Sequence, residues 1–499
     1  MNETVTKKLP EGWQWATMEG IADVIGGGTP KSKESRYYEG GEIPWLTPAD
    51  LSGYKNKYVT RGRRNITEEG LNSSSAKLMP AGSVLFTSRA PIGYVVIASN
   101  EISTNQGFKS FVMKNENILP DYVYWWLKGN KQLAESVASG TTFLELSGAK
   151  AKKLPIPVAP LEQQKRIVAQ IEELFSHIDA GIEALKKAKR LLKQYRQSVL
   201  KAAVTGGLTK EWREARIKDD AQGSANVAGG TTPGATKLET APQLLERILK
   251  ERRQKWEEQQ FEQFKTKGKM PKDDKWKENY KEPKAPALKV DVNYPEEWEL
   301  VSIDQVAEVL LGKMLDKSKH TTGEKLPYLR NINVRWGSVA TNDVSEMFFK
   351  EGELERYNLI SGDVLVCEGG EPGRAAVWHD EIPNMKYQKA LHRVRFYLPL
   401  VPEYLSLLLE YFASTGLLTR YFTGSTIKHF TKESFISLPF PLPALAEMKK
   451  IVELVEEKIT NIVRLEAEID VQLLKSEKNK QSILASAFSG KLSVEEALQ

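Results

Sequence analysis

The residue types that usually carry catalysis are present in this sequence, but their spacing does not form catalytic motifs. Gly26–Ser32 resembles a phosphate-binding loop, yet Pro30, which has no N–H, stands where such a loop needs a glycine before Lys31. We interpret this stretch as a glycine turn that leaves a strand. Motifs for a serine nucleophile, for nucleotide binding and for amino-methyl transfer are missing. The histidines show no metal-ligand spacing: His177, His320, His379, His392 and His429. The sequence therefore predicts no catalysis, no bound metal and no cofactor held by this chain.

One stretch of the sequence has residue types suited to binding: a run of cationic residues that contains no acidic residue. This run spans residues 55–64 and includes Lys55, Lys57, Arg61, Arg63 and Arg64. Its neighbours Tyr54, Tyr58 and Gly62 favour contact with nucleic-acid phosphates. A solvated face is the ordinary alternative for such a run. The net charge of +6, from 71 basic and 65 acidic residues, is too small to decide between these interpretations.

Length and composition limit the class of protein. The 499 residues allow about three domains, and 40% hydrophobic with 27% charged residues is ordinary for a globular chain. The longest apolar runs, such as Tyr94–Ala98, are far shorter than the ~20 residues of a membrane helix. Met1–Lys8 lacks an apolar signal core, and the single Cys367 allows no internal disulfide. We therefore expect a cytoplasmic protein.

The elements that must position any binding residues are organised by an internal repeat. Segments of the first half return in the same order in the second half, 280–285 residues later. The paired segments are Leu9–Trp13 with Tyr294–Trp298, Ile43–Leu46 with Leu326–Leu329, Ala81–Phe86 with Ser361–Val366, Ser139–Thr142 with Thr423–Thr426, and Leu154–Pro157 with Leu438–Pro441. A period of this length indicates a duplicated domain and not a solenoid.

Each copy is predicted to consist of a globular segment and one long helix. The globular segments alternate short β-type runs with turns and hold an aromatic helical stretch, Asp121–Leu127 in one and Glu403–Phe412 in the other. This mixture indicates an α+β fold. The strand-like runs are Ser83–Thr87, Tyr94–Ala98, Asp363–Cys367 and His392–Tyr397.

The two long helices carry the clearest periodic signal. Pro160 and Gly206 bracket the first, and Pro443 and Gly490 bracket the second. Their apolar residues recur in steps of three and four, as in a coiled-coil seam. About 45 residues at 1.5 Å each form a rod of ~67 Å, which is longer than a domain of this size. We therefore expect the helices to pair with each other; the alternative is that each packs only on its own globular segment.

These patterns divide the chain into six parts. They are 1–159, the first globular domain; 160–206, the first long helix; 207–293, a linker; 294–443, the second globular domain; 444–490, the second long helix; and 491–499, a C-terminal tail. Within the linker, residues 220–236 have the small, polar composition of a flexible tether. A charged helix is predicted over about Pro242–Lys267, followed by a Lys/Pro-rich stretch. This part is either a solvated arm, which we favour, or an additional contact to nucleic acid.

Leu154–Val168, with the sequence Leu-Pro-Ile-Pro-Val-Ala-Pro-Leu-Glu-Gln-Gln-Lys-Arg-Ile-Val, resembles the junction in specificity subunits of type I restriction–modification systems. There, a proline-rich segment leaves a target-recognition domain and a Glu-Gln turn begins a long spacer helix. Other segments similar to that family are Gly82–Arg89, Thr104–Gly107 and Ser139–Thr142. The second half departs from the pattern, because Leu445–Val452 lacks the glutamine and Cys367–Gly373 has acidic residues in place of the Ser-Arg pair.

The resemblance implies a DNA-recognition subunit that leaves catalysis to its partners. Two target-recognition domains would each read half of a split target in double-stranded DNA. An antiparallel pair of coiled-coil helices would separate them, with a pseudo-twofold axis relating the repeats. Two modification subunits would methylate adenine N6 with S-adenosylmethionine, and restriction subunits would use ATP and Mg for translocation and cleavage. No membrane partner is implied.

Base readout uses Arg or Lys for guanine, Asn or Gln for adenine and Thr methyls for thymine, presented on loops. We predict DNA contacts in the first domain at Thr47, Asp50, Lys55, Lys57, Arg61, Arg63, Arg64, Ser88, Arg89, Thr141 and Thr142. In the second domain we predict them at Arg330, Asn331, Asn333, Arg335, Arg374 and Lys428. A structural or phosphate-facing role is the alternative for each. Helices of the modification subunits are predicted to dock on exposed stripes that contain Val168, Leu174, Leu192 and Tyr195.

Two other function classes remain as alternatives. A coiled-coil scaffold whose duplicated domains bind proteins would explain the helices but not the family-like junction. A nuclease or methyltransferase acting alone would need the motifs that are missing.

Overall fold

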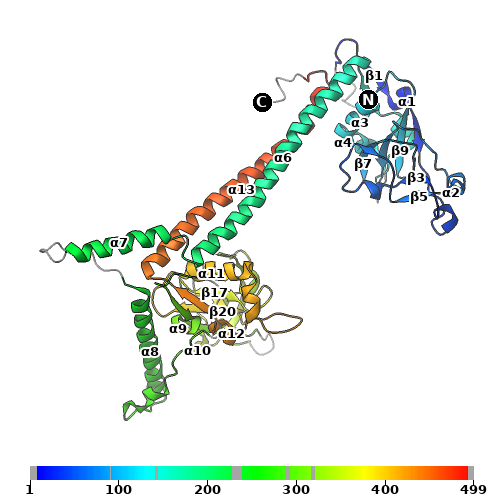
Figure 1. The fold of residues 1–499 in the computed structure, drawn as a ribbon. Helices are drawn as coiled ribbons and strands as arrows, with labels where there is room; N and C mark the ends of the chain where they lie inside the picture. Colours follow the sequence, from blue (N-terminus) through cyan, green and yellow to red (C-terminus); the bar gives the residue numbers. More distant parts are fainter. Residues whose placement is uncertain are drawn as a thin grey trace. The chain divides into compact units, whose positions relative to one another are not determined.

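The computed structural model describes residues 8–89, 91–140, 144–226, 239–286, 293–315 and 321–492. The chain forms two units (Figure 1): unit 1 comprises Met1–Ala188 and Glu468–Gln499, and unit 2 comprises Lys189–Ala467. The division falls inside the two long helices, α6 (Leu161–Val204) and α13 (Leu445–Ala487), and not at their ends. Each unit therefore contains one globular segment, the first part of one long helix and the last part of the other.

Unit 1 is built on a five-stranded sheet with the strand order β2-β9-β6-β7-β4. The central strand β6 is buried along its length, with Val84 and Phe86 in one core cluster and Leu85 in another, because successive side chains of a strand alternate. A three-stranded sheet, β5-β3-β8, and the pair β1-β10 complete the unit. The strands are β1 (Gln14–Thr17), β2 (Ala22–Gly26), β3 (Ile43–Leu46), β4 (Tyr58–Val59), β5 (Arg64–Ile66), β6 (Val84–Ser88), β7 (Ile92–Ala98), β8 (Ser103–Thr104), β9 (Phe108–Met113) and β10 (Pro155–Val158).

Helix α3 (Pro120–Gly129) packs against strands β6 and β7 of this sheet. Its residues from Tyr122 to Leu127 are all buried, which accounts for the aromatic run in the sequence. Pro120 lies in the first turn, where its missing N–H costs no helical hydrogen bond. The other helices of unit 1, besides its part of α6 and α13, are α1 (Met18–Ile21), α2 (Glu68–Asn72), α4 (Lys131–Val137) and α5 (Gly148–Lys152).

Unit 2 repeats this plan. Its main sheet has the order β12-β20-β17-β18, a second sheet has the order β16-β13-β19, and β14-β15 and β11-β21 form pairs. The strands are β11 (Glu299–Ser302), β12 (Ala307–Leu311), β13 (Glu324–Leu329), β14 (Val334–Arg335), β15 (Ser338–Val339), β16 (Ser345–Phe349), β17 (Val364–Cys367), β18 (Ala375–Val377), β19 (Lys386–Tyr387), β20 (Leu391–Phe396) and β21 (Pro439–Leu442). Its shorter helices are α7 (Lys210–Asn226), α8 (Ala241–Thr266), α9 (Ile303–Val306), α10 (Glu351–Leu354), α11 (Pro402–Ser414) and α12 (Lys432–Ile436). The mixed strands and helices confirm the predicted α+β class.

The duplication is visible in individual hydrogen bonds as well as in strand order. Main-chain bonds at equivalent positions are Met18 N to Leu154 O and Ile303 N to Leu438 O, and Asn105 N to Leu46 O and Gln388 N to Leu329 O. The indole of Trp13 donates to Gln163, and the indole of Trp298 donates to Glu447 at the start of the other long helix. The equivalent residues of these bonds lie 283–285 positions apart, within the 280–285 spacing of the sequence repeat. Both copies therefore keep one architecture.

The two long helices pack against each other in each unit, as predicted. In unit 1 the beginning of α6 shares a core with the end of α13, which contains Ile167, Ile171, Ile483 and Ala487. In unit 2 the end of α6 shares a core with the beginning of α13, which contains Val199, Ala203, Ile451 and Val455. The helices are therefore antiparallel. Both cores also include residues of the adjacent globular segment, so the helix ends are attached firmly to it.

The linker contains more helix than the sequence predicts. Helix α7 extends to Asn226, so the predicted tether over 220–236 is wrong for its first residues, and 227–236 lie outside the described residues. Helix α8 matches the predicted charged helix within a residue at each end. Its first turns are not a free arm, because Leu244 and Ile248 are fully buried in the core of unit 2.

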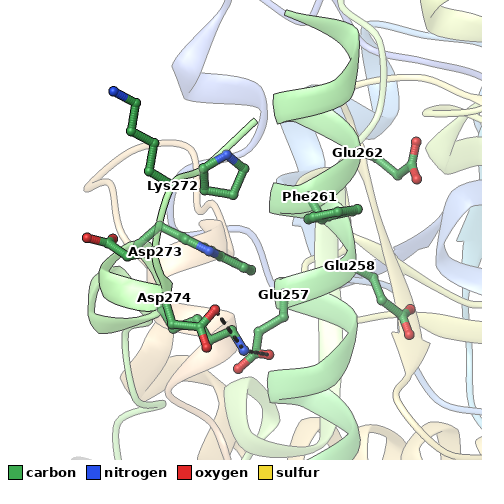
Figure 2. A pocket seen from close by; sticks show the side chains of 10 residues that line it. Glu257, Glu258, Phe261, Glu262, Lys272, Asp273 and Asp274 are labelled. Carbon is green, nitrogen blue, oxygen red and sulfur yellow. Dashed lines mark ion pairs between the residues drawn. The ribbon is translucent and has the colours of Figure 1, made fainter. Parts of the chain in front are cut away.

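The remainder of α8 forms a small structure of its own. Trp256 and Phe264 pack against Trp276, and Trp256 also contacts Tyr280. A cavity of about 700 Å³ lies between this part of α8 and the segment 271–277 (Figure 2). None of the residues that line it is among the predicted DNA contacts.

Throughout the described ranges, no helix has the length and apolar content needed to cross a membrane.

Candidate nucleic-acid interface

Four loops of unit 1 meet at the ends of its sheets, and we call this surface loop face 1. It comprises residues 47–50 after β3, 88–89 after β6, 105–107 before β9, and the hairpin 139–145 as far as it is described. Ser88 N donates to the carbonyl of Gly107 over 2.7 Å, and Leu146 N donates to the carbonyl of Ser88 over 2.9 Å. These bonds hold loops from distant parts of the sequence in one place.

Unit 2 builds the equivalent surface, loop face 2, from residues 330–333, 367–374, 388–390 and 423–430. Glu368 is its centre: Glu368 N donates to the carbonyl of Ala390 over 2.9 Å, and its own carbonyl accepts from Phe430 N over 2.8 Å. The Asn331 side chain donates to the carbonyl of Gly369. The two main-chain junctions of loop face 1 therefore recur in loop face 2, although the loop sequences differ.

Arg63 lies against Thr47 and Asp50 of loop face 1. One Asp50 oxygen accepts from the Thr47 hydroxyl over 2.7 Å, and the other accepts from Arg63 Nε over 2.8 Å. Burial raises the pKa of Asp50, but the bonds from Arg63 and Thr47 outweigh it, so the pKa lies below its usual value. Asp50 therefore positions Arg63, whose side chain is 74% exposed and available to a partner.

Two further residues of loop face 1 have different surroundings. Ser88 is fully buried, and its hydroxyl donates to the carbonyl of Gly107, so its position gives it a structural role and does not support the predicted base contact. Arg89 is partly exposed and lies 3.7 Å from Glu145 of the hairpin. Thr141 and Thr142 lie outside the described residues.

The basic run does not form one continuous patch. Lys55 and Arg61 are exposed, and the guanidinium of Arg64 lies 3.9 Å from the centre of the Tyr38 ring. Lys57 instead points into the protein, where its ammonium group contacts Asp121 and Glu172. Burial lowers the pKa of Lys57, but the bonds to these carboxylates outweigh it and raise the pKa above its usual value. Its charge is thus neutralised within unit 1 and is not presented to phosphates.

The predicted residues of loop face 2 form a connected cluster. Arg374 donates to the main-chain carbonyl of Asn331 over 2.9 Å and pairs with Glu371 over 2.7 Å. Arg330 pairs with Asp343. Asn333 is 2% exposed, and its amide bonds only to main-chain groups, so its position gives it a structural role. Its prediction as a base-reading residue is therefore not supported by its position.

Arg335 and Lys428 are exposed, Arg335 on the β14-β15 pair and Lys428 on the hairpin 423–429. Sequence reasoning missed the acidic residues Glu145 and Glu371 as partners of arginines: Glu145 lies near Arg89 from another loop, and Glu371 pairs with Arg374 three residues later in the same loop. It also missed Trp336, whose indole donates to Glu371. No local pattern marks Glu145 or Trp336, because each is distant in sequence from the residue it contacts.

The glycine stretch after β2 packs closely against the backbone beside loop face 1. A Cβ on Gly27 would lie 2.0 Å from the carbonyl oxygen of Asn105, and one on Gly28 would lie 2.1 Å from Ala76 N. Only glycine permits these backbone approaches. The structure therefore confirms the interpretation of a glycine turn that leaves a strand.

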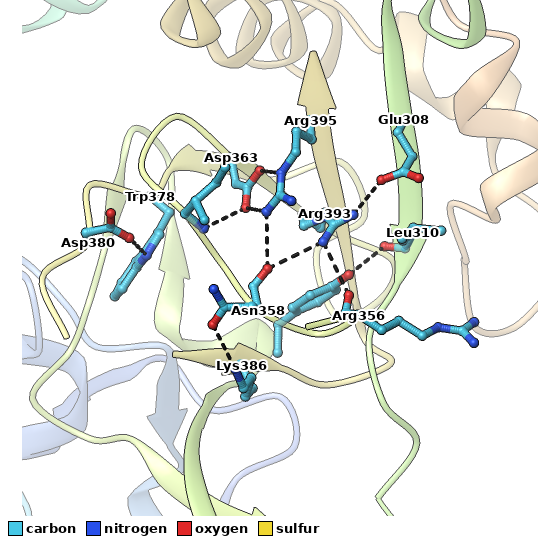
Figure 3. A network of polar contacts seen from close by, with 12 residues as sticks. Glu308, Leu310, Arg356, Asn358, Asp363, Trp378, Asp380, Lys386, Arg393 and Arg395 are labelled. Carbon is cyan, nitrogen blue, oxygen red and sulfur yellow. Dashed lines mark hydrogen bonds and ion pairs between the residues drawn. The ribbon is translucent and has the colours of Figure 1, made fainter. Parts of the chain in front are cut away.

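A buried ionic network supports the sheets of unit 2 (Figure 3). Both Asp363 oxygens accept from Arg395 over 2.7 Å, and Arg393 donates to Glu308 over 2.6 Å. In unit 1, Ser110 of β9 pairs with Leu85 of β6 in the same way that Arg393 of β20 pairs with Leu365 of β17. The position equivalent to Arg393 therefore carries a neutral residue in unit 1. The two copies thus keep one fold with different interior chemistry.

His392 connects this sheet to the hairpin of loop face 2. Its ring is fully buried, and Nε2 donates to the carbonyl of Phe430 over 2.6 Å. Burial lowers the pKa of His392 to about 4, against opposing effects of the Phe430 bond and of Glu433 and a smaller lowering by Lys432. The folded protein therefore keeps this ring neutral at pH values where an unfolded chain would protonate it.

We expect the stability of unit 2 to fall as the pH falls from about 6.5 to about 4. In this window the unfolded state binds a proton at His392 that the folded state does not, which costs about 2–3 kcal/mol by pH ~4.5. Urea titrations of the full chain at several pH values should show this slope. His392→Gln should remove it, whereas His429→Gln, at an exposed position, should retain it. An unchanged slope in His392→Gln would contradict this assignment.

The predicted partner-binding residues divide into two groups. Val168 and Leu174 are 8% and 5% exposed and belong to the core of unit 1, so the expectation that they lie on an exposed stripe is wrong. They face inward because α6 packs against both α3 and α13. Leu192 is half-buried and Tyr195 is 46% exposed. Other exposed apolar residues of the long helices are Leu191, Val463, Leu465, Val471 and Leu474.

Known proteins resemble this chain in sequence. The specificity subunit of the type I restriction enzyme MjaIX of Methanocaldococcus jannaschii is 40% identical over 195 residues, which cover 38% of this chain and 44% of that protein. The EcoR124I/EcoR124II specificity subunit of Escherichia coli is 31% identical over 36% of this chain and 46% of its own length. The chain therefore spans less than half the length of these two relatives. The EcoKI specificity subunit of Escherichia coli K12 is 22% identical over 98% of this chain and 91% of its own.

Solved structures share the fold. A chain from a study of assembly and conformational transition in the type I R-M system has a TM-score of 0.62 at 16% identity, covering 97% of this chain and all of that one. The HsdS subunit from Thermoanaerobacter tengcongensis has a TM-score of 0.55 at 17% identity, covering 98% and 99%. The model of the type I restriction modification DNA specificity domain matches residues 10–189 and again 295–475, one match for each repeat. Because these matches include most of the chain, the protein belongs to the family of type I restriction modification DNA specificity domains.

Proposed function

We propose that this chain is the DNA-recognition subunit of a type I restriction–modification complex. Each loop face reads one part of a split target in double-stranded DNA, and the chain itself performs no catalysis. The observation that carries this proposal is the construction of the same loop junctions in both units with different side chains on them. Two surfaces with one framework and two chemistries suit the reading of two different half-sites.

The proposal assigns the chemistry to partners. Two modification subunits bind S-adenosylmethionine and methylate adenine N6 within the target, and restriction subunits supply cleavage driven by ATP and Mg. Exposed apolar residues on the long helices, such as Tyr195 and Leu191, favour a helical docking surface for the modification subunits. Burying apolar side chains against a partner helix contributes about 25 cal/mol per Å² of apolar surface, which must exceed the entropy lost on association.

The test maps methylated adenines in the DNA of cells that express this chain with its modification subunit. We expect methylation at a single two-part sequence, and none when either protein is expressed without the other. Purified chain incubated with S-adenosylmethionine and DNA should incorporate no methyl groups. Methyl incorporation by the chain alone, or methylation without any two-part sequence, would contradict the proposed function.

A further inference from the structure

The hairpin at residues 423–429 of loop face 2 presents a large apolar side chain to solvent. Ile427 at its tip is 67% exposed, while its neighbours Thr426 and Lys428 are also exposed. Two more apolar side chains of adjacent loops are exposed, Ile332 at 51% and Met314 at 58%. Large apolar side chains exposed on loops beside predicted DNA contacts are candidates for contact with a partner.

The hairpin is held in place by the protein beneath it. Thr423 and His429 exchange two main-chain hydrogen bonds of 2.8 and 2.9 Å, and this single β-bridge closes the loop between them. The next residue, Phe430, is bound by Glu368, which directly follows strand β17, and by His392 of strand β20. Gly424 has φ +89°, and a Cβ there would lie 2.2 Å from the Ile427 carbonyl oxygen, so the turn requires glycine. Ile427 therefore sits on a defined turn.

The internal repeat places an apolar residue at the same position of the other unit. Ser139 and Glu145 pair as Thr423 and His429 do. At the same spacing of 284, Phe143 corresponds to Ile427, although Phe143 itself lies outside the described residues. The surrounding loop sequences differ between the copies, yet both sequences have an apolar residue at this position of the repeat.

We propose that Ile427 is a specificity-determining residue that reads the 5-methyl group of a thymine in the major groove. This inference rests on the proposed function. The major groove is wide enough for protein segments to reach the base edges, and the methyl of thymine is the apolar group displayed on those edges. An isoleucine side chain has no donor or acceptor for the amino, keto and ring-nitrogen groups of the other edges. The exposed Lys428 beside it is suited to contact phosphate. Such a contact positions the hairpin on the DNA but does not select a sequence.

The experiment uses the full chain assembled with its modification subunit and duplexes that contain the target found by methylation mapping. Thymines are replaced one at a time by deoxyuridine, which lacks only the 5-methyl group. We expect one replacement to weaken binding by about fourfold, the value of one buried methyl group. Ile427→Ala should bind the thymine and deoxyuridine duplexes equally at that position. Lys428→Ala is the matched control and should weaken both duplexes by the same factor.

The possible failures are distinguishable. If the wild-type complex selects its target but no deoxyuridine replacement matters, this inference is overturned and the proposed function stands. The inference is also overturned if Ile427→Ala keeps the fourfold preference at the sensitive thymine. A wild-type complex that binds a duplex without the target as tightly as the target duplex overturns the proposed function, and the inference with it. Because Ile427 is exposed, thermal melting of the variant should match the wild type, which shows that lost discrimination does not come from unfolding.

Discussion

Leu174→Asp is expected to unfold unit 1 and to lower its free energy of unfolding by about 5 kcal/mol. Leu174 is 5% exposed on α6 and shares a core with Ile171, Trp125 and Ile483. Replacement removes a packed side chain, which alone costs about 2–5 kcal/mol, and it adds a carboxylate without a partner in an apolar environment. Urea unfolding followed by tryptophan fluorescence should report the loss, because Trp125 belongs to the same core.

The matched control lies on the same helix. Tyr195→Asp changes a side chain that is 46% exposed, so the free energy of unfolding should stay within about 0.5 kcal/mol of the wild type. Under the proposed function, this variant should instead lose its modification subunit in co-purification. A wild-type unfolding curve for Leu174→Asp would show that the core of unit 1 is assigned incorrectly. Loss of stability in Tyr195→Asp would show that the exposed position has a structural role.

Replacing Arg61, Arg63 and Arg64 together by glutamine is expected to weaken DNA binding several hundredfold at about 0.1 M salt. Each phosphate contact contributes about 0.9 to the slope of log K against log salt, so three lost contacts lower that slope by about 2.7. All three side chains are exposed, and folding should change little. Fluorescence anisotropy with a mixed-sequence duplex at several salt concentrations measures both the affinity and the slope.

Cations on α8 provide the control for this experiment. Arg247, Arg253 and Lys265 are exposed and pair with acidic residues of their own segment. Glutamine at these three positions should leave the salt slope unchanged, because each cation already pairs with an acidic residue of its own segment. An equal loss of slope in both triple variants would show that the arginines act only through net charge. An unchanged slope in the Arg61, Arg63 and Arg64 variant would contradict phosphate contact there.

Those features of the protein that depend on local pattern were predictable from the sequence. The aromatic runs and the bracketing proline and glycine residues predicted α3, α11, α6 and α13. Long periodic helices can be recognised from the sequence, because every third or fourth residue must meet the same apolar surface. The repeat and the proline-rich junction predicted the family before any tertiary contact was known. Both can be recognised by comparing short stretches of the sequence.

The roles of single side chains were decided by tertiary structure. Lys57 and Arg63 belong to the same basic run, yet Lys57 is neutralised by Asp121 and Glu172 while Arg63 is held in solvent by Asp50. The spacing of Leu174 along α6 does not show whether its side chain is exposed. In the structure it belongs to a core that also contains residues of α3 and α13. Charge and hydrophobicity are properties of a residue, whereas exposure depends on which distant segments pack around it. The sequence alone therefore determined the architecture and the family, and only the tertiary structure decided which residues of the predicted interface can reach a partner.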